Sequence, residues 1–333
     1  MVFWALRAFA QSAPDASAPS AGSLREIVAI TESLPQLRGL IVARDGEVLV
    51  RQGFRGYAPD EKTNIKSLSK TVLSALVGIA IARGVLMSTS QPIASLLADA
   101  LPAAADPRLK RVTLGHLLSM RAGLESTSDD RYGAWIAAPD QVRFALGRPF
   151  VAEPGGDYLY STGNTHLLSA ILTRASGRST LELMRAWLGE PLGIGIAPWE
   201  RDAQGIYLGG NNMMLSALGL LAFAEMYRNG GRAGGQQIVP EAWVATSWTP
   251  RGPARYFGHD YGYGWFIARM ADQEVRYGWG YGGQMLYVVP ALGLSVVMVS
   301  GAQEGALQSG YIARLHALLV QIIELAATGA APR

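Results

Sequence analysis

The sequence predicts an α+β protein, with an antiparallel five-stranded sheet flanked by helices and a mostly helical lobe inserted between the strands. Strand patterns occur near the start of the chain, at residues 39–52, and again toward its end, at residues 261–300. Helical patterns fill the region between them, and a further amphipathic pattern covers residues 305–327. This order predicts one antiparallel sheet that is built from both ends of the chain.

The first strands are expected to form a hairpin. The apolar segments at residues 39–44 and 47–52 flank Asp45-Gly46, a pair that readily adopts the positive φ angles of a tight β-turn. A short amphipathic helix is expected before them, at residues 24–34. Residues 1–23 are rich in Ala, Ser and Pro, which is typical of a disordered leader or of a signal-peptide remnant. The remnant would imply a periplasmic or secreted protein, and the leader a cytoplasmic one.

Residues 67–84 predict the helix around which the fold is arranged. Apolar residues recur at helical spacing from Leu68 to Ile81, and Gly84 suits a C-terminal cap. Past its first turn this helix carries almost no polar side chain, so protein must cover all its faces. Further helices are expected at residues 93–97, 113–120, 139–146, 167–175, 180–188 and 215–228.

These patterns divide the chain into two lobes. Residues 24–85 and 230–333 carry the strands and the helices that cover them, and form an α/β lobe. Residues 86–229 form a mainly helical lobe. We expect an active site between the lobes.

The first turn of the central helix holds Ser67 and Lys70, which lie three residues apart and therefore on one face. A lysine that is desolvated beside a serine loses affinity for its proton and can accept one from the hydroxyl. The backbone N–H of Ser67 and the positive end of the helix dipole would then face an oxyanion. The pattern alone is equally compatible with a serine cap and a lysine that extends to solvent.

Composition argues against several other kinds of site. The 333 residues contain no cysteine, and their four histidines lack the HExxH spacing, so we expect no metal. The net charge of +3 comes mostly from scattered arginines, which argues against nucleic acid as a partner. No run of eighteen apolar residues occurs, so no membrane span is expected. A GxGxxG spacing at residues 278–283 leads into a strand and not a helix, and predicts no dinucleotide cofactor.

Two glycine-rich segments offer further site residues. Tyr160 lies between Gly-Gly and Gly-Asn just before a helix, where a loop tyrosine is available for chemistry. Residues 278–284, with the sequence GWGYGGQ, enter a strand whose edge a substrate can approach, and there the amide of Gln284 can serve as an oxyanion donor. Each segment also has a purely structural interpretation, as a hydrogen-bonded loop tyrosine and as a tight turn.

In this order, the segments resemble the superfamily of serine β-lactamases and penicillin-binding proteins. The similarity is to its class C β-lactamase-like branch, which includes family VIII esterases, D-amino-acid peptidases and 6-aminohexanoate-dimer hydrolases, and it runs from about residue 39 to residue 300. The nucleophile helix is matched by NIKSLSKTVLSALVG, the following helix and turn by LGHLLSMRAGL, and the tyrosine loop by PGGDYLYSTGN. The strands beside the site are matched by YGYGW and GYGGQMLYVVP.

The resemblance implies a role for each residue. Ser67 would be the acylated nucleophile, Lys70 its base, and Tyr160 a second acid/base group. The oxyanion hole would be formed by the amides of Ser67 and Gln284. We expect the lysine and the tyrosine to share protons, with the phenol displaced toward phenolate. The implied function is that of a serine hydrolase, without a cofactor, that cleaves ester or amide bonds through an acyl-enzyme.

The sequence departs from that superfamily where substrates bind. The pattern Tyr-x-Asn is replaced by Tyr160-Ser161-Thr162, and Tyr281-Gly282-Gly283 stands in place of Lys-Thr-Gly. The cation that would hold the carboxylate of a penicillin or a peptide is therefore missing, and small neutral esters or amides fit better than β-lactams. The substrate is expected to contact Thr162, Tyr281, Gly282, Gly283, Trp135, Tyr132 and Trp279.

Three other interpretations stay open. Within the same mechanism, the alternative is β-lactamase or D-amino-acid peptidase activity. Outside it, the chain could be a penicillin-binding-like module that binds without turnover. A Ser-His-Asp triad with His166 or His259 would also be a hydrolase, but no feature of the sequence distinguishes either histidine, and a structural role is favoured. No Gly-x-Ser-x-Gly motif occurs, which argues against an α/β-hydrolase.

Overall fold

A seven-stranded antiparallel sheet forms the centre of the fold. The computed structural model describes residues 27–31, 33–301 and 310–328, so the expected leader at residues 1–23 lies outside the described residues. Strands from the two ends of the chain meet where β1 pairs with β11, which confirms the predicted α+β class. In sheet order the strands are β2 (Glu47–Gly53), β1 (Leu37–Arg44), β11 (Leu294–Ser300), β10 (Gln284–Val289), β9 (Gln273–Gly280), β8 (Phe266–Met270) and β7 (Asp260–Tyr261).

The sheet is wider than the five strands that were expected. One reason is that β7 contains only two residues, too few for an alternating pattern to show in the sequence. Shorter pairs lie outside the main sheet. They are β3 (Lys62–Asn64) with β4 (Met214–Ser216), and β5 (Arg232–Ala233) with β6 (Gln236–Gln237).

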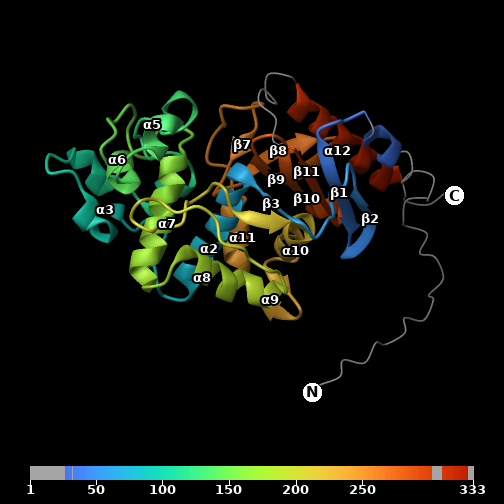
Figure 1. Ribbon diagram of the computed structural model, residues 1–333, viewed down its shortest axis with the longest axis horizontal. Helices are drawn as coiled ribbons and strands as arrows, with labels where there is room; N and C mark the ends of the chain where they lie inside the picture. The colour runs from blue at the N-terminus through green and yellow to red at the C-terminus, as the bar shows by residue number, and fades with distance from the viewer. Residues whose placement is uncertain (1–26, 32, 302–309, 329–333) are drawn as a thin grey trace, which may run out of the picture.

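Helices cover both faces of the sheet, and the strands alternate between the two cores accordingly. Val297 and Val299 of β11 pack with the core of α2 (Ser69–Ala82) and α10 (Ala217–Arg228). Val296 and Met298, one position away, pack with α12 (Tyr311–Thr328) on the opposite face. Figure 1 shows α12 and α10 on the two sides of the sheet. The final helix thus packs on the sheet, as its amphipathic pattern predicts.

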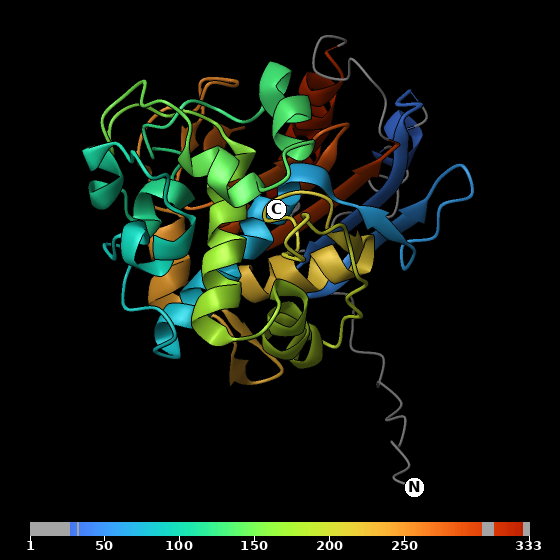
Figure 2. The same ribbon diagram turned by 60° about the vertical axis from the view of Figure 1, so that its left-hand side comes forward.

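The remaining helices gather beside the sheet. Figures 1 and 2 show α7 (Thr162–Ser176) beside α2, with shorter helices around them. The shorter elements are α3 (Ile93–Leu96), α4 (Leu114–Leu118), α5 (Tyr132–Ile136), α6 (Gln141–Leu146), α8 (Thr180–Met184), a π-helical turn (Arg185–Gly189), α9 (Glu190–Leu192) and α11 (Glu241–Ser247). Short 3₁₀ turns cover Ala98–Ala100, Pro107–Arg111, Asp129–Arg131 and Pro290–Leu292.

Helix α2 is covered on all sides, as its sequence requires. Every residue from Ser69 to Ala80 is buried. At Gly78, a Cβ would lie 2.3 Å from the ring of Trp243, so α11 packs directly on the backbone of α2 at this point. The helix begins two residues later than expected, because a 3₁₀ turn at Lys66–Leu68 precedes it. Among the described residues, no helix combines the length and apolarity that crossing a bilayer requires.

Candidate active site

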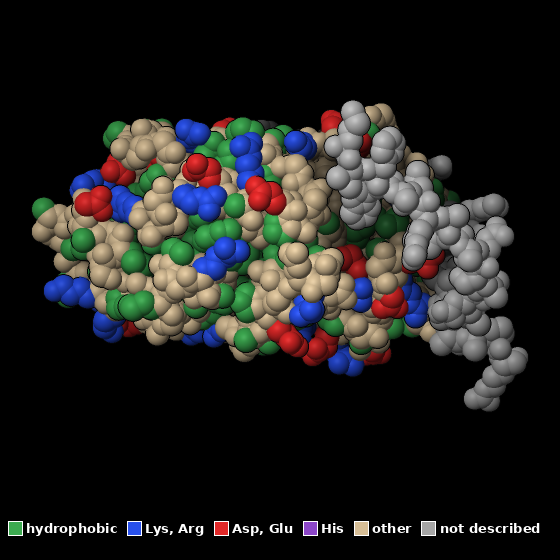
Figure 3. Space-filling view, turned by 90° about the horizontal axis from the view of Figure 1, so that it is seen from below, with side chains coloured by type: hydrophobic (Ala, Val, Ile, Leu, Met, Phe, Trp, Pro, Cys, Tyr) green, Lys and Arg blue, Asp and Glu red, His purple; other side chains and the backbone are tan. Residues whose placement is uncertain are grey.

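A cavity of about 820 Å³ opens at the N-terminal end of α2. Ser67 lines it from the 3₁₀ turn at Lys66–Leu68 (the Ser67 turn), Lys70 from α2, Thr162 from the start of α7, and Trp279 from β9. Residues from both ends of the chain and from its middle therefore meet at this cavity. Figure 3 shows that acidic and basic side chains are interspersed over one face of the molecule, without a large area of one sign.

The turn before α2 presents Ser67 to the cavity. Lys66 has a φ angle of 51°, in the left-handed region, and its backbone is held at both ends. Its N–H donates to Asn64 Oδ1 at 2.9 Å, and its carbonyl accepts from Ser69 Oγ at 2.5 Å. Ser67 follows at the middle of the 3₁₀ turn and is half-buried, so its hydroxyl is accessible from the cavity.

Lys70 is buried beside this serine. Its ammonium group lies within hydrogen-bond distance of Ser67 Oγ at 3.1 Å, Thr162 Oγ1 at 3.3 Å and the carbonyl oxygen of Gly210 at 2.7 Å. Burial lowers the pKa of Lys70 to about 7, because desolvation disfavours the charged form. A substantial fraction of the lysine is then a neutral amine near neutral pH, which is the form that accepts a proton.

Tyr160 lies near both Ser67 and Lys70. Its hydroxyl is hydrogen-bonded to Ser67, and its ring centroid is 4.9 Å from Lys70 Nζ. Burial raises the pKa of the phenol well above its usual value, and the hydrogen bond with Ser67 lowers it only in part. The expected displacement toward phenolate is therefore wrong: both groups are buried, and burial favours a neutral amine beside a neutral phenol.

The start of α7 belongs to the site, and it lies earlier than the sequence indicated. The helix begins at Thr162 and not near residue 167, because two hydroxyl groups satisfy its first N–H groups. Thr162 N–H donates to Ser128 Oγ at 2.9 Å, and Gly163 N–H donates to Thr127 Oγ1 at 2.7 Å. This places the hydroxyl of Thr162 between Lys70 Nζ and Ser128 Oγ, which is 3.0 Å away.

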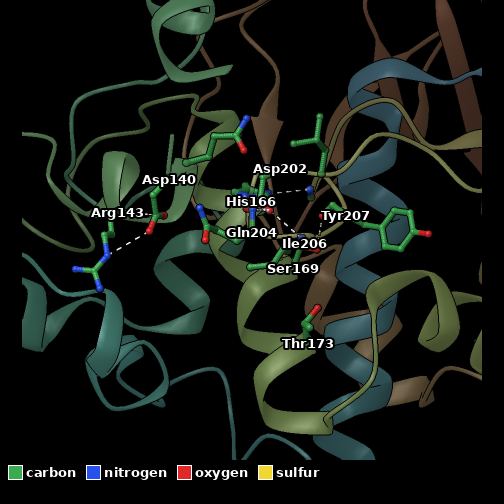
Figure 4. Close-up of polar contacts among 12 residues, drawn as sticks. Asp140, Arg143, His166, Ser169, Thr173, Asp202, Gln204, Ile206 and Tyr207 are labelled. Atoms are coloured by element: carbon green, nitrogen blue, oxygen red, sulfur yellow. Dashed lines mark hydrogen bonds and ion pairs between the residues drawn. The ribbon is translucent and has the colours of Figure 1, made fainter. Parts of the chain in front are cut away.

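His166 and Asp202 form a buried hydrogen-bonded pair next to the segment that contacts Lys70. Figure 4 shows His166 of α7 facing Asp202 of the neighbouring loop. Both nitrogens of the imidazole ring have a hydrogen-bond partner. His166 Nε2 donates to Asp202 Oδ2 at 2.9 Å, and Gly209 N–H donates to His166 Nδ1 at 3.3 Å. Both ring nitrogens are thus occupied away from Ser67, which favours a structural role for this histidine over membership of a catalytic triad.

Gly210 connects this pair to Lys70. It follows Gly209 directly, has a φ angle of +76°, and offers its carbonyl oxygen to Lys70 Nζ. A Cβ at this position would lie 2.3 Å from Thr165 Oγ1 and 2.7 Å from Lys70 Cγ, so only glycine fits. The contacts of α7 with residues 207–210 therefore hold the carbonyl that orients the Lys70 amine.

Several of the predicted substrate contacts lie at the cavity, and others do not. Thr162, Tyr281, Tyr132 and Trp279 line it. Trp135 does not: it is fully buried in the core, packs on the rings of Tyr132 and His166, and donates its indole N–H to Gln141 O. Its neighbour Ile136 faces the cavity instead.

The glycines after Tyr281 also lie away from the cavity. Neither Gly282 nor Gly283 lines it, and a Cβ at Gly283 would lie within 2.9 Å of Tyr311 and Leu315 on the opposite face of the sheet. These two glycines form the turn between β9 and β10, outside the lining of the cavity.

The expected oxyanion donor Gln284 does not reach the site either. It is buried at the start of β10, where it pairs with Gly280, and its side-chain amide donates to Ser300 O at 2.6 Å. The strand that lies against the Ser67 turn is β9: a Cβ at Gly280 would lie 2.2 Å from Ile65 O, and one at Gly278 would lie 2.2 Å from Leu68 Cδ1. Backbone N–H groups near Trp279 are therefore the candidates for the second donor.

Other cavity residues have no motif that would have revealed them. Tyr256 packs its ring against those of Tyr160 and Trp279, and Asn211 donates to the hydroxyl of Tyr132 at 2.6 Å. The cavity is further lined by Lys66, Thr71, Ser128, Asp129, Ile136, Glu200, Asn212, Tyr261, Gly264 and Phe266. The only sequence signal among them was the run of hydroxyl residues at 126–128.

Comparisons with known proteins agree with this architecture. A family model described as Beta-lactamase matches residues 30–321. The 6-aminohexanoate-dimer hydrolase of Paenarthrobacter ureafaciens is 24% identical over 226 residues, which cover 61% of this chain. The match spans about half of that curated relative, 55% of its length.

Solved structures share the fold over nearly their whole length. A penicillin-binding protein homologue from Caulobacter crescentus superposes with a TM-score of 0.73 at 20% identity, covering 96% of this chain and 99% of that one. EstCE1, a hydrolase with promiscuous acyltransferase activity, superposes with a TM-score of 0.74 at 18% identity, covering 90% of this chain and 98% of that one. At these identities the likeness establishes the fold alone.

Proposed function

Because the chain belongs to the beta-lactamase family, we propose that it is a serine hydrolase that cleaves ester or amide bonds through an acyl-enzyme on Ser67. The observation that carries this proposal is the 3.1 Å contact between Lys70 Nζ and Ser67 Oγ, in surroundings that lower the pKa of the lysine to about 7. The names of the relatives support it, since they include a 6-aminohexanoate-dimer hydrolase and a hydrolase with promiscuous acyltransferase activity.

In the acylation step, the neutral Lys70 amine accepts the proton of Ser67 as Oγ bonds to the substrate carbonyl carbon. The Ser67 N–H and the end of β9 stabilise the oxyanion that forms. As the intermediate collapses, the bond to the leaving group breaks and Tyr160 gives its phenolic proton to that group. The Lys70 ammonium then returns a proton to Tyr160, so the serine proton ends on the leaving group.

In the deacylation step, water attacks the acyl-enzyme and its proton passes to the same Lys70 and Tyr160 pair. Ser67 Oγ leaves the acyl carbon and takes that proton back, which restores the resting site. The raised pKa of Tyr160 suits the role of proton donor, because the phenol stays protonated until a basic leaving group develops.

The mechanism is tested by measuring intact protein mass after incubation with a fluorophosphonate, p-nitrophenyl butyrate or benzylpenicillin. We expect wild type to gain the phosphonyl mass and, transiently, the butyryl mass. Ser67→Ala should gain neither, with an unchanged melting temperature. Ser90→Ala, which removes an exposed serine remote from the cavity, is the control and should react as wild type does.

Three outcomes separate the possible functions. An adduct that forms with the ester and clears quickly identifies an esterase or amidase. A stable penicilloyl adduct identifies a penicillin-recognising protein. Folded Ser67→Ala that turns over esters at the wild-type rate contradicts the mechanism, and absence of any adduct on wild type favours a binding module.

A further inference from the structure

Lys66 is a second lysine in the active-site cavity, directly before the nucleophile. The residue is half-buried and is among those that line the cavity. Among the described residues, no carboxylate lies within ion-pair distance of its ammonium group, and the group donates no hydrogen bond to any of them. Lys70, by contrast, has an oxygen partner for each of its three N–H groups. The cavity therefore contains one cation whose partner is not supplied by these residues.

The backbone at Lys66 makes the choice of a lysine there informative. Its φ angle of 51° lies in the left-handed region, which costs a residue with a Cβ on the order of 1 kcal/mol and glycine almost nothing. Asn64 and Ser69 hold the conformation through the bonds to the Lys66 N–H and carbonyl. The turn needs that conformation but not a side chain, so the side chain points to a function of its own.

The position of Lys66 indicates what its side chain could bind. Its Cβ lies 3.1 Å from the site that a Cβ of Gly280 would occupy, so its side chain starts beside the end of β9. The next residue, Tyr281, lines the cavity where a carboxylate-binding lysine was expected and is absent. The cation of Lys66, in the Ser67 turn, therefore lies next to the end of β9, where the expected carboxylate-binding lysine is absent.

The other charges of the cavity leave Lys66 uncompensated. Asp129 is paired with Arg255 at 3.1 Å, and Glu200 accepts a hydrogen bond from the side-chain amide of Asn212. We propose that Lys66 forms a subsite for a carboxylate of the substrate, so that the preferred esters or amides carry an anionic group near the bond to be cleaved. This inference rests on the proposed hydrolase function and narrows its substrate class.

The test compares matched substrates that differ only in charge. On the acyl side, p-nitrophenyl monoglutarate is compared with p-nitrophenyl valerate; on the leaving-group side, 4-acetoxybenzoate is compared with 4-acetoxybenzamide. Lys66→Asn removes the charge with a residue that tolerates the left-handed region, and Lys66→Arg retains it. Lys62→Asn, which removes an exposed lysine outside the cavity, is the matched control.

For each pair, we compare kcat/KM for the anionic substrate with kcat/KM for its neutral partner. In Lys66→Asn, this ratio should fall about tenfold or more for at least one pair, as expected for the loss of a hydrogen bond to a charged group. Lys66→Arg should keep most of the ratio, and Lys62→Asn all of it. Ratios that do not change in either pair overturn the inference. So does a wild-type preference for a cationic ester, p-nitrophenyl 4-(trimethylammonio)butanoate, which would indicate recognition by Glu200.

A binding measurement separates this inference from the proposed function. Calorimetry with 4-acetoxybenzoate and Ser67→Ala protein needs no turnover. Binding that weakens about tenfold or more in the Ser67→Ala, Lys66→Asn double variant supports the subsite even if wild type hydrolyses no ester. Binding that the second substitution leaves unchanged overturns it, whether or not the enzyme is active.

Discussion

The buried pair of His166 and Asp202 leads to a sharp prediction about the isosteric substitution Asp202→Asn. Asp202 uses Oδ1 to accept the backbone N–H groups of Gln204 and Ile206, and Oδ2 to accept His166 Nε2–H. An asparagine that keeps the two backbone bonds turns its NH₂ group toward Nε2. The histidine must then carry its proton on Nδ1, where it meets the N–H of Gly209.

The geometry sets the size of the effect. Every arrangement of the asparagine and the ring leaves donors facing each other, at Nε2, at Nδ1 or, if the amide turns over, at the backbone N–H groups of Gln204 and Ile206. The side chains of both residues are fully buried, so water cannot satisfy the excess donor. One unsatisfied buried donor costs about 1–3 kcal/mol, and we expect a loss of that size in the free energy of unfolding at pH 7.

Urea denaturation measures this loss, and Asp140→Asn is the matched control. Figure 4 shows Asp140 near the same network, where it caps α6 by accepting Arg143 N–H at 2.8 Å. Asparagine caps helices as well as aspartate does, so this control should change stability by less than about 0.5 kcal/mol. Asp202→Asn that is as stable as Asp140→Asn would refute the assignment of the histidine proton.

The pH dependence gives a second check on the same variant. Burial alone would raise the pKa of Asp202, but the hydrogen bond from His166 and those from the backbone offset it, and the net direction is a lowered pKa. A carboxyl group with a lowered pKa stabilises the fold above its unfolded-state pKa and loses that contribution as the pH falls through the folded value. The deficit of Asp202→Asn should therefore shrink below about pH 4.

Two further predictions concern Lys70 and Tyr160. Burial lowers the pKa of Lys70 to about 7, so above pH 7 the folded state binds fewer protons than the unfolded state. The free energy of unfolding of wild type, measured by urea denaturation relative to that of Lys70→Met, should therefore rise between pH 7 and pH 10. A difference that stays constant over this range would contradict the buried amine. Tyr160→Phe should slow acylation of Ser67 about a hundredfold in stopped-flow assays with p-nitrophenyl butyrate. Tyr158→Phe is the control, because it removes a buried hydroxyl that has no hydrogen-bond partner among the described residues, and it should not slow acylation. An equal loss of rate in both variants would show that Tyr160 acts only by packing.

The contact between Ser67 and Lys70 could be predicted because it is local. Ser67 and Lys70 lie one turn apart at the start of a helix whose apolar pattern is unmistakable, and helix geometry alone brings such side chains together. The general course of the sheet was equally predictable, since alternation marks each of the long strands.

Trp135 shows where pattern reasoning stops. It lies in the five-residue helix α5, which is too short for its sequence to reveal which face is buried. The structure buries Trp135 and turns Ile136 to the cavity, so the pocket wall is one residue away from the predicted one.

Gln284 was misplaced for a different reason, the relative length of neighbouring strands. β8 begins at Phe266, which pairs with Tyr277, so the last residues of β9 have no partner on that side. This free end reaches the Ser67 turn, whereas Gln284 lies in β10 with β9 and β11 on its two sides. A single sequence contains no signal for such an offset between strands.

The contact of Gly210 with Lys70 joins residues 140 positions apart and depends on a backbone carbonyl, which no side-chain pattern marks. Its consequence is chemical. A neutral lysine has two N–H groups and one lone pair, and the Gly210 oxygen can only accept, so it fixes one N–H. The Thr162 hydroxyl can accept the second while it donates to Ser128 Oγ. The lone pair of Lys70 is then left for the proton of Ser67, so the arrangement of the two acceptors selects the orientation in which the amine acts as a base.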